Sequence, residues 1–225
     1  MNKKLIAPAL LAGGLILSGC NPQNAEQQHS HTSQSAQAPT LLPDFKKRLD
    51  IYHPVELTAD ISHLSDNQKK MLGVLIDASK IMDDLFWKQA YGENYQDLLN
   101  SIADPATQQF AGINYGPWDR LQGDEAFLSG IEDKPTGAQF YPADMTKEEL
   151  NESHVEDKTG LYSMVVRDAN GELTSVPYSE FFNEELTRAA KLLEQAAELA
   201  ENAEFANYLK MRAKALLTDD YQASD

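Results

Sequence analysis

The sequence predicts a mainly α-helical fold with one β-hairpin, an α+β class in which helices supply most of the core. Apolar residues recur at spacings of three and four over residues 66–91 and again over 179–217, which predicts amphipathic helices. Asn170-Gly171 lies between two runs rich in β-branched and aromatic residues, which predicts the hairpin. We find no internal repeat in the sequence.

The start of the chain is typical of a targeting segment. Two lysines precede the apolar run from Leu5 to Leu17, whose 13 residues are too few for the ~20 that a membrane-spanning helix needs. Leu17-Ser18-Gly19-Cys20 then resembles the lipobox of bacterial lipoproteins, which implies cleavage before Cys20 and lipid attachment to its sulfur. The alternative is an ordinary signal peptide with an incidental cysteine, but this cysteine is the only one in the chain. We therefore expect a signal peptide over 1–19.

The residues after the signal peptide predict a protein that is attached to the membrane through its lipid alone. Asn21 follows the cysteine where an aspartate could stand, and by resemblance to Gram-negative sorting patterns this favours the outer membrane, with the protein facing the periplasm. Residues 20–43 are rich in Gln, Ser and Ala and cannot bury enough apolar surface to offset their ordering entropy. We expect them to form the lipid anchor and a flexible tether in the bacterial cell envelope.

One helical lobe is expected from Asp44 to residue 225. A short helix opens it, and Pro54 ends that helix. Ser65 is the expected N-cap of a long helix over 66–91. Its inward positions are Met71, Leu75, Ala78, Met82, Leu85 and Phe86. Two shorter helices are expected over 95–103 and 106–111.

The middle of the chain changes character. Residues 112–142 contain five glycines and three prolines without a sustained period, which predicts a long loop, a feature that is often functional. Thr146 and Glu149 have the spacing of a capping box, which predicts a short helix. Beyond the hairpin we expect helices over 179–202 and 204–217. The inward residues of the last helix should be Phe205, Tyr208, Leu209, Ala213 and Leu216.

Charge and motifs exclude several functions. With 35 acidic against 19 basic residues the formal charge is −16, which argues against nucleic-acid binding and against adhesion to anionic lipid through a basic face. The sequence contains no His-Glu-x-x-His pair, Gly-x-Ser-x-Gly elbow, phosphate loop or dinucleotide fingerprint. His53, His63 and His154 are far apart, which favours surface or cap histidines over metal ligands. We expect no cofactor in this chain.

Residues 113–121, INYGPWDRL, are the strongest candidate for a ligand-facing loop. Tyr115 and Trp118 offer broad apolar faces with polar tips. Asp119 and Arg120 could receive the terminal amine or carboxylate of a ligand. The alternative is structural, with Trp118 in a core and Arg120 paired with an acid, and the stretch favours neither interpretation. FYPADMT, residues 140–146, has the same character and should lie beside it.

From Val55 onward the chain resembles the N-terminal part of bacterial proteins related to dipeptidyl peptidase III, a family of zinc-dependent exopeptidases. The resemblance rests on the stretches VELTADISHLS, FWKQAYG, INYGPWDRL, GAQFYPADMTKEE and ALLTDDYQASD. It implies two lobes with a cleft between them. Zinc would be held by a His-Glu-x-x-Gly-His helix and by a second, acidic helix, and a glutamate at the zinc site would activate the metal-bound water. This sequence contains neither motif, so zinc is expected in a lobe that is missing here.

The function that the resemblance implies is that of the N-terminal substrate-cleft lobe of a membrane-anchored, zinc-dependent peptidase-like hydrolase, truncated at its C-terminal end. INYGPWDRL and DDYQASD would line the cleft, and Asn114, Tyr115 and Arg120 would contact the backbone or terminus of a peptide-like substrate. The alternative is a complete lipoprotein that binds a ligand or a partner protein without chemistry. Whether the chain is an enzyme by itself stays open.

Overall fold

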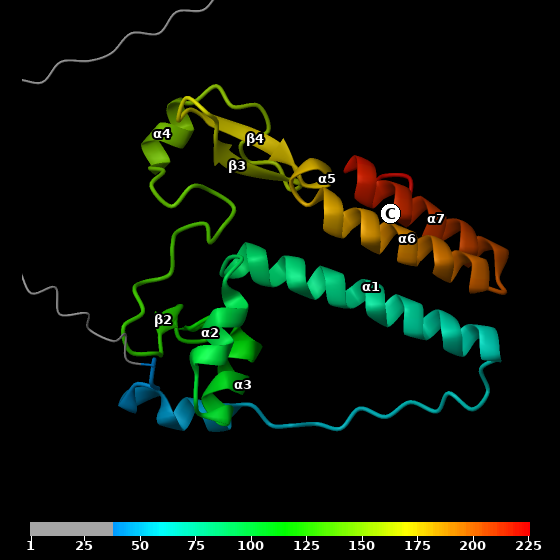
Figure 1. Cartoon of the computed structure of the whole chain (residues 1–225), viewed down its shortest axis with the longest axis horizontal. Coiled ribbons are helices and arrows are strands. Elements are labelled where there is room, and N and C mark those ends of the chain that lie inside the picture. The colour runs from blue at the N-terminus through cyan, green and yellow to red at the C-terminus, as the bar shows by residue number, and fades with distance from the viewer. Residues whose placement is uncertain (1–37) are drawn as a thin grey trace, which may run out of the picture. The chain divides into compact units, whose positions relative to one another are not determined.

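The computed structural model describes residues 38–225 (Figure 1). The predicted signal peptide, the lipidation site Cys20 and the tether up to residue 37 lie outside the described residues. Helices and two small antiparallel sheets form the described part, so the predicted mainly α, α+β class is confirmed. Within residues 38–225, no helix combines the length and the apolar character that a bilayer crossing requires.

Three long helices form one part of the fold. Helix α1 (Asp66–Ala90) packs against α6 (Asn183–Leu199), which in turn packs against α7 (Ala203–Thr218) (Figure 1). Small side chains fill the contacts, because Ala189, Ala196 and Ala213 are each at most 1% exposed and allow the helices to approach closely. The predicted amphipathic spacing therefore encodes a helical bundle.

The start of α1 confirms the predicted cap. The Ser65 hydroxyl accepts a hydrogen bond from the Gln68 backbone N–H at 3.1 Å, and the Gln68 side chain accepts one from the Ser65 N–H at 3.0 Å. Two of the N–H groups that a helix leaves without partners are thereby satisfied.

The predicted hairpin is also confirmed. Strand β3 (Ser163–Arg167) pairs with β4 (Leu173–Pro177) in antiparallel register, and Pro177 stands at the end of its strand. The helix expected over 179–202 is divided at Phe182 into α5 (Tyr178–Phe181) and α6. Asp219 caps the start of α5, since both of its carboxylate oxygens accept the Ser179 N–H, at 3.1 and 3.2 Å.

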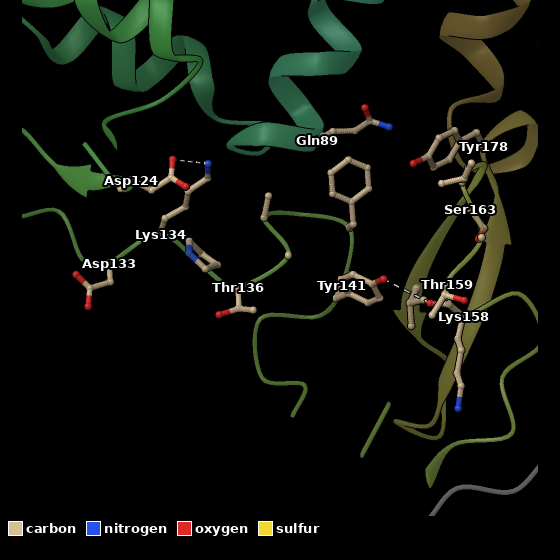
Figure 2. Close-up of a pocket in the computed structure, with 18 of the residues that line it drawn as sticks. Gln89, Asp124, Asp133, Lys134, Thr136, Tyr141, Lys158, Thr159, Ser163 and Tyr178 are labelled. Atoms are coloured by element: carbon tan, nitrogen blue, oxygen red, sulfur yellow. Dashed lines mark hydrogen bonds and ion pairs between the residues drawn. The ribbon is translucent and has the colours of Figure 1, made fainter. Parts of the chain in front are cut away.

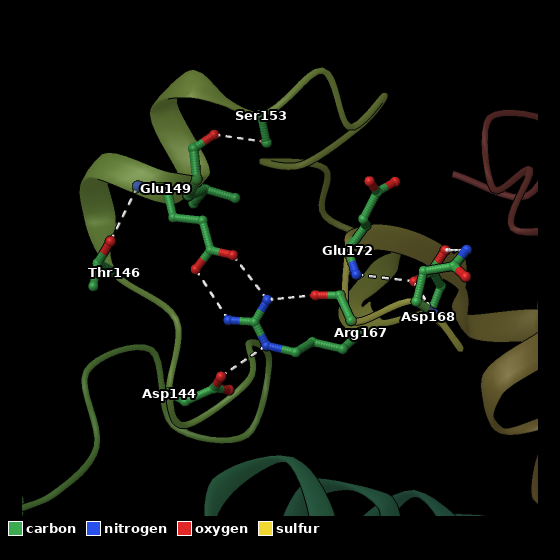
Figure 3. A network of polar contacts seen from close by, with 10 residues as sticks. Asp144, Thr146, Glu149, Ser153, Arg167, Asp168 and Glu172 are labelled. Carbon is green, nitrogen blue, oxygen red and sulfur yellow. Dashed lines mark hydrogen bonds and ion pairs between the residues drawn. The ribbon is translucent and has the colours of Figure 1, made fainter.

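Arg167 ties the hairpin to helix α4 (Lys147–Glu152) (Figure 3). Its guanidinium donates to both oxygens of Glu149 at 2.8 and 3.0 Å and to Asp144 at 2.8 Å. The Thr146 hydroxyl accepts from the Glu149 N–H as predicted, but the reciprocal half of the capping box is not formed because the Glu149 carboxylate binds Arg167. The same contact lowers the pKa of Glu149.

A second part of the fold surrounds an aromatic core. It consists of the 3₁₀-helix η1 (Pro43–Ile51), α2 (Tyr95–Ser101), α3 (Pro105–Asn114) and the two-residue strands β1 (Trp118–Asp119) and β2 (Glu125–Ala126). The Phe110 and Phe127 rings meet edge to face with their centroids 4.7 Å apart, and the centroids of the Phe45 and Phe127 rings are 6.2 Å apart. These rings let a region of short elements bury a continuous core.

Contacts with the rest of the fold begin a few residues before Asp44: the Leu42 N–H donates to the Phe127 carbonyl at 2.9 Å and the Thr40 carbonyl accepts from the Ser129 N–H at 2.8 Å. Two other expectations are wrong. The long loop expected over 112–142 is interrupted by the end of α3 and by the β1–β2 hairpin.

The second error concerns inward faces. On α1, Phe86 is 41% exposed although the helical spacing predicts it inward. The same error occurs on α7. Leu209, Ala213 and Leu216 are buried as expected, but Phe205 is 37% and Tyr208 38% exposed. Their rings stack on each other with a distance of 6.1 Å between the ring centroids. Helix α7 packs mainly on α6, so one of its faces stays uncovered at this end.

Replacing Phe127 should test the aromatic core. The side chain is 0% exposed, so Phe127→Ala removes a fully buried ring and leaves a cavity, and we expect a loss of about 3–5 kcal/mol in the free energy of unfolding. Leu121→Ala is the control, because Leu121 is 67% exposed and should change stability by less than about 0.5 kcal/mol. Urea unfolding followed by circular dichroism measures both. Equal losses in the two variants would contradict the assignment of the core.

Candidate functional site

INYGPWDRL turns a corner between a helix and a strand. Ile113 and Asn114 end α3, so the expectation of a loop is wrong for them. Tyr115 follows in the left-handed conformation at φ 52°. Gly116 has φ 152°, and a Cβ atom placed on it would lie 3.0 Å from the Trp118 ring. A glycine is needed here because the chain reverses while that ring packs against its backbone.

Asn114 closes this corner from within. Its amide nitrogen donates to the Phe110 carbonyl at 3.0 Å, and its amide oxygen accepts from the Arg120 backbone N–H at 3.1 Å. The side chain is buried, at 4% exposed. Asn114 therefore fixes the position of Arg120 from the end of α3.

Asp119, the fifth predicted site residue, lies in a buried ion pair and lines neither of the cavities described below. Its carboxylate is 0% exposed and accepts from Arg48 Nε at 2.7 Å and from Arg48 Nη2 at 3.2 Å. The Leu121 N–H also donates to it, at 3.0 Å. The hydrogen bond to Asp119 raises the pKa of Arg48. A carboxylate whose oxygens are occupied in this way is not available to a ligand amine.

The other four predicted residues meet at one cavity. Asn114, Tyr115, Trp118 and Arg120 line a cavity of about 150 Å³. Phe86, Gln89, Ala90, Lys134, Ala138 and Phe140 complete its wall. The Trp118 ring is 7% exposed and its indole nitrogen donates to the Glu132 carbonyl at 2.9 Å. Trp118 thus agrees with both the structural and the ligand-facing interpretation, because it is anchored in the core and also lines the cavity.

A larger cavity of about 1070 Å³ adjoins the small one (Figure 2). The two share Gln89, Lys134, Ala138 and Phe140 as lining residues. Segments 133–141, 158–163 and 123–125 supply most of its wall, α1 adds Gln89, and Figure 2 shows Gln89, Tyr141 and Tyr178 around it. Phe140 and Tyr141 open the FYPADMT stretch, so this stretch does lie beside the INYGPWDRL residues. The volume is at the upper end of the range for small-molecule sites.

The charges near the cavities differ in their availability. Lys134 pairs with Asp124 at 2.9 Å. The Lys158 ammonium donates to the carbonyls of Leu150, Asn151 and Ser153 at 2.8–3.0 Å, and in Figure 2 it points away from Tyr178. The Arg120 guanidinium lies over the Phe86 ring, 5.9 Å from its centroid, and forms no ion pair within residues 38–225. Arg120 is therefore the cation best placed to receive an anionic group.

Tyr115 is held by an acid of α1. Its hydroxyl donates to the Asp83 carboxylate, and its ring meets Phe86 edge to face at 4.5 Å. The hydrogen bond to Asp83 raises the pKa of Tyr115, and partial burial adds to this effect. Asp83 of α1 thus orients a cavity residue.

Several lining residues escape prediction from the sequence. Gln89, Lys134 and Tyr178 come from three separate segments, and no local pattern distinguishes them. Residues 219–225, expected at the cleft, line neither cavity; Asp219 caps α5, and Asp225 pairs with Arg212 at 2.8 Å.

The described residues do not fit a zinc ion. Over residues 38–225, no three His, Cys, Asp or Glu side chains are close enough together to hold a metal.

Replacing Asp83 should test the contact with Tyr115. Because the folded-state pKa of Tyr115 is raised, the stability from this contact is fully present below the ordinary tyrosine pKa of about 10 and is lost as pH rises through the folded-state pKa. Asp83→Asn should lower the pKa of Tyr115 toward its ordinary value. An NMR titration of ¹³Cζ-labelled tyrosine measures this. Asp77→Asn is the control, since Asp77 pairs with Lys80 on α1; an unchanged Tyr115 pKa in Asp83→Asn would refute the contact.

Comparisons with known proteins agree on one family among the solved structures. No protein-family model matches the chain. Nudix hydrolase 3 from Arabidopsis thaliana is 31% identical, in an alignment that covers 80% of this chain and 31% of the plant protein. Dipeptidyl peptidase III from Caldithrix abyssi is 39% identical with a TM-score of 0.73, over 80% of this chain and 36% of that one. Dipeptidyl-peptidase III from Corallococcus sp. strain EGB is 34% identical with a TM-score of 0.71, over 79% and 36%.

The chain spans about a third of the length of each of these relatives. The name of the plant protein points to a different class of hydrolase, but it describes a protein of which most lies outside the alignment. The two bacterial structures share both sequence and fold with about four fifths of this chain. This chain is therefore related to dipeptidyl peptidase III.

Proposed function

We propose that the chain is the substrate-cleft lobe of a peptidase-like hydrolase related to dipeptidyl peptidase III. The observation that carries the proposal is the meeting of Asn114, Tyr115, Trp118 and Arg120 at a cavity that adjoins a much larger one. Zinc, in this proposal, belongs to a part of the protein outside these 225 residues, where it would polarise the scissile carbonyl.

The described residues would grip and place a peptide. Trp118, Phe86 and Phe140 supply apolar walls for a side chain. Arg120 supplies a charge-assisted hydrogen bond to a carboxylate or a backbone carbonyl. Asn114 holds the Arg120 backbone, and Asp83 holds the Tyr115 ring, so these contacts are organised before a ligand arrives. Such preorganisation reduces the entropy lost on binding.

The alternative is a lipoprotein that binds a ligand or a partner protein without chemistry. The same cavities serve that function, so binding alone does not separate the two. Hydrolysis does separate them, because only the first function requires the remaining part of a dipeptidyl peptidase III. The name of the plant relative points to a ligand that is not a peptide. Binding of ADP, a phosphate-bearing control ligand, is therefore compared with binding of the peptide.

Replacing Arg120 should weaken peptide binding. Isothermal titration of the chain with tetra-alanine should give a dissociation constant at least tenfold higher for Arg120→Ala, because the guanidinium loses its hydrogen bond to the peptide. The matched control is Arg188→Ala, since Arg188 is exposed on α6 and lines neither cavity. Tetra-alanine amide, which lacks the terminal carboxylate, distinguishes recognition of the terminus from recognition of the backbone.

Three results would contradict the cleft assignment. Equal affinity in the wild-type chain and in Arg120→Ala would remove Arg120 from the site. An equal loss in Arg188→Ala would indicate nonspecific attraction of charge. Tighter binding of ADP than of tetra-alanine would favour a phosphate-bearing ligand over a peptide.

We also propose that Cys20 carries a lipid that attaches the protein to the bacterial cell envelope, on the outer membrane facing the periplasm. The support is the Leu-Ser-Gly-Cys pattern and the position of the only cysteine. Cys20→Ser should abolish incorporation of an alkyne-tagged palmitate in a Gram-negative host and release the protein from the membrane fraction. Ser30→Ala is the control in the tether. Unchanged labelling of Cys20→Ser would refute the proposal.

A further inference from the structure

The segment between η1 and α1 is extended and has no partner in the described part of the chain. It leaves η1 and reaches the N-terminal end of α1 without forming a helix or a strand pair (Figure 1). Among residues 38–225, no backbone N–H or C=O of residues 54–60 forms a hydrogen bond to another backbone group. A strand whose two edges are both open is a template for pairing with another chain or sheet.

Its sequence has the alternation of a half-buried β-strand. Residues 55–62, VELTADIS, place Val55, Leu57, Ala59 and Ile61 on one side and Glu56, Thr58, Asp60 and Ser62 on the other. The apolar side is bare: Val55 is 70%, Leu57 92% and Ile61 47% exposed. This pattern specifies a sheet face that covers a core, and residues 38–225 supply no core beneath it.

An apolar stripe of α1 is also uncovered. Leu72 is 37% and Ile76 54% exposed, and their spacing of four residues places them on the same side of the helix. Figure 1 shows the extended segment on the side of α1 opposite to α6. The bundle thus covers one side of α1, and Leu72 and Ile76 on another side stay exposed within residues 38–225.

We propose that residues 55–62 form a β-strand that joins a sheet in the part of a dipeptidyl peptidase III-like protein outside these 225 residues, and that the same body covers the exposed stripe of α1. The proposal rests on the proposed function for the kind of partner. The bacterial relatives supply such a body, because about two thirds of each solved chain lies beyond the region that this chain matches.

Other occupants fit the strand less well. A second copy of the chain would give a two-stranded ribbon with one face still uncovered, and such a ribbon is marginally stable in water. A lipid surface is disfavoured because Glu56 and Asp60 lie on the strand and the whole chain carries a formal charge of −16.

Hydrogen–deuterium exchange on two proteins tests the pairing. The first is the chain itself. The second is the Caldithrix abyssi dipeptidyl peptidase III in which this chain replaces the region it matches. Amides of residues 55–61 should exchange without protection in the chain alone and at least 100-fold more slowly in the chimaera, because pairing occupies their hydrogen bonds. The Ser62 amide is left out because it already donates to the Asp60 carboxylate at 2.8 Å. Amides of α6 should be equally protected in both proteins, which verifies the fold.

Two variants test which side of the strand is covered. Leu57→Lys puts a charge on the apolar side and should restore fast exchange of residues 55–61 in the chimaera. Thr58→Lys is the matched control on the polar side and should keep the protection. Neither should alter thermal unfolding of the chain alone, because the two side chains are exposed there.

Fast exchange of residues 55–61 in a chimaera with protected α6 amides would overturn the proposal. If the chimaera does not fold, the chain co-expressed with the remaining part of the Caldithrix abyssi protein gives the same readout. Protection in the chain alone that rises with concentration would assign the strand to a second copy, and protection by phosphatidylglycerol vesicles would assign it to lipid. None of these outcomes depends on peptide affinity, so strand pairing and peptide binding can each fail separately.

Discussion

The buried contact between Asp119 and Arg48 is the constraint on which the candidate site depends. It joins residues 71 positions apart and fixes β1 against η1 with a carboxylate that no solvent reaches. Successive side chains of a strand point to opposite faces. Because Asp119 points into the protein, its neighbours Trp118 and Arg120 are directed to the cavity side, where both are lining residues. Asp119 thus lies outside the cavity wall but holds the strand that carries two of the lining residues.

The cavity is built by elements that have little in common in the sequence. Helix α1 contributes Phe86 and Gln89, the corner after α3 contributes Tyr115, and segment 133–141 contributes Lys134 and Phe140. Two of these side chains are held by acids that do not line this cavity: Tyr115 donates a hydrogen bond to Asp83, and Lys134 donates one to Asp124. The ligand-facing groups are therefore supported by the scaffold, which is what a site for a shaped ligand requires. In a chain with such an acidic balance, Arg120 provides a local positive charge.

The molecule presents two surfaces of different kinds. One is concave, mixed in polarity and anchored by hydrogen bonds, as binding sites are. The other consists of an extended strand and a helix stripe, is apolar, and has no protein over it within residues 38–225. The chain matches about a third of each bacterial relative. In our two proposals the first surface binds a peptide and the second joins a further body, so that recognition and assembly use separate residues.

Local patterns by themselves determined the helices, the Ser65 cap and the β3–β4 hairpin, because periodicity, capping and an Asn-Gly turn act over a few residues. They also singled out INYGPWDRL. Only the tertiary structure decided that Asp119 is buried while Arg120 is available, since the partner Arg48 is remote in the sequence. It likewise placed Phe86, Phe205 and Tyr208 outward, because helical spacing defines a face but not which neighbours cover it. The alternation of apolar and polar residues over 55–62 is present in the sequence, but this pattern does not show whether a sheet pairs with the segment. In each case the physical reason is that pairing and burial are set by contacts between distant segments.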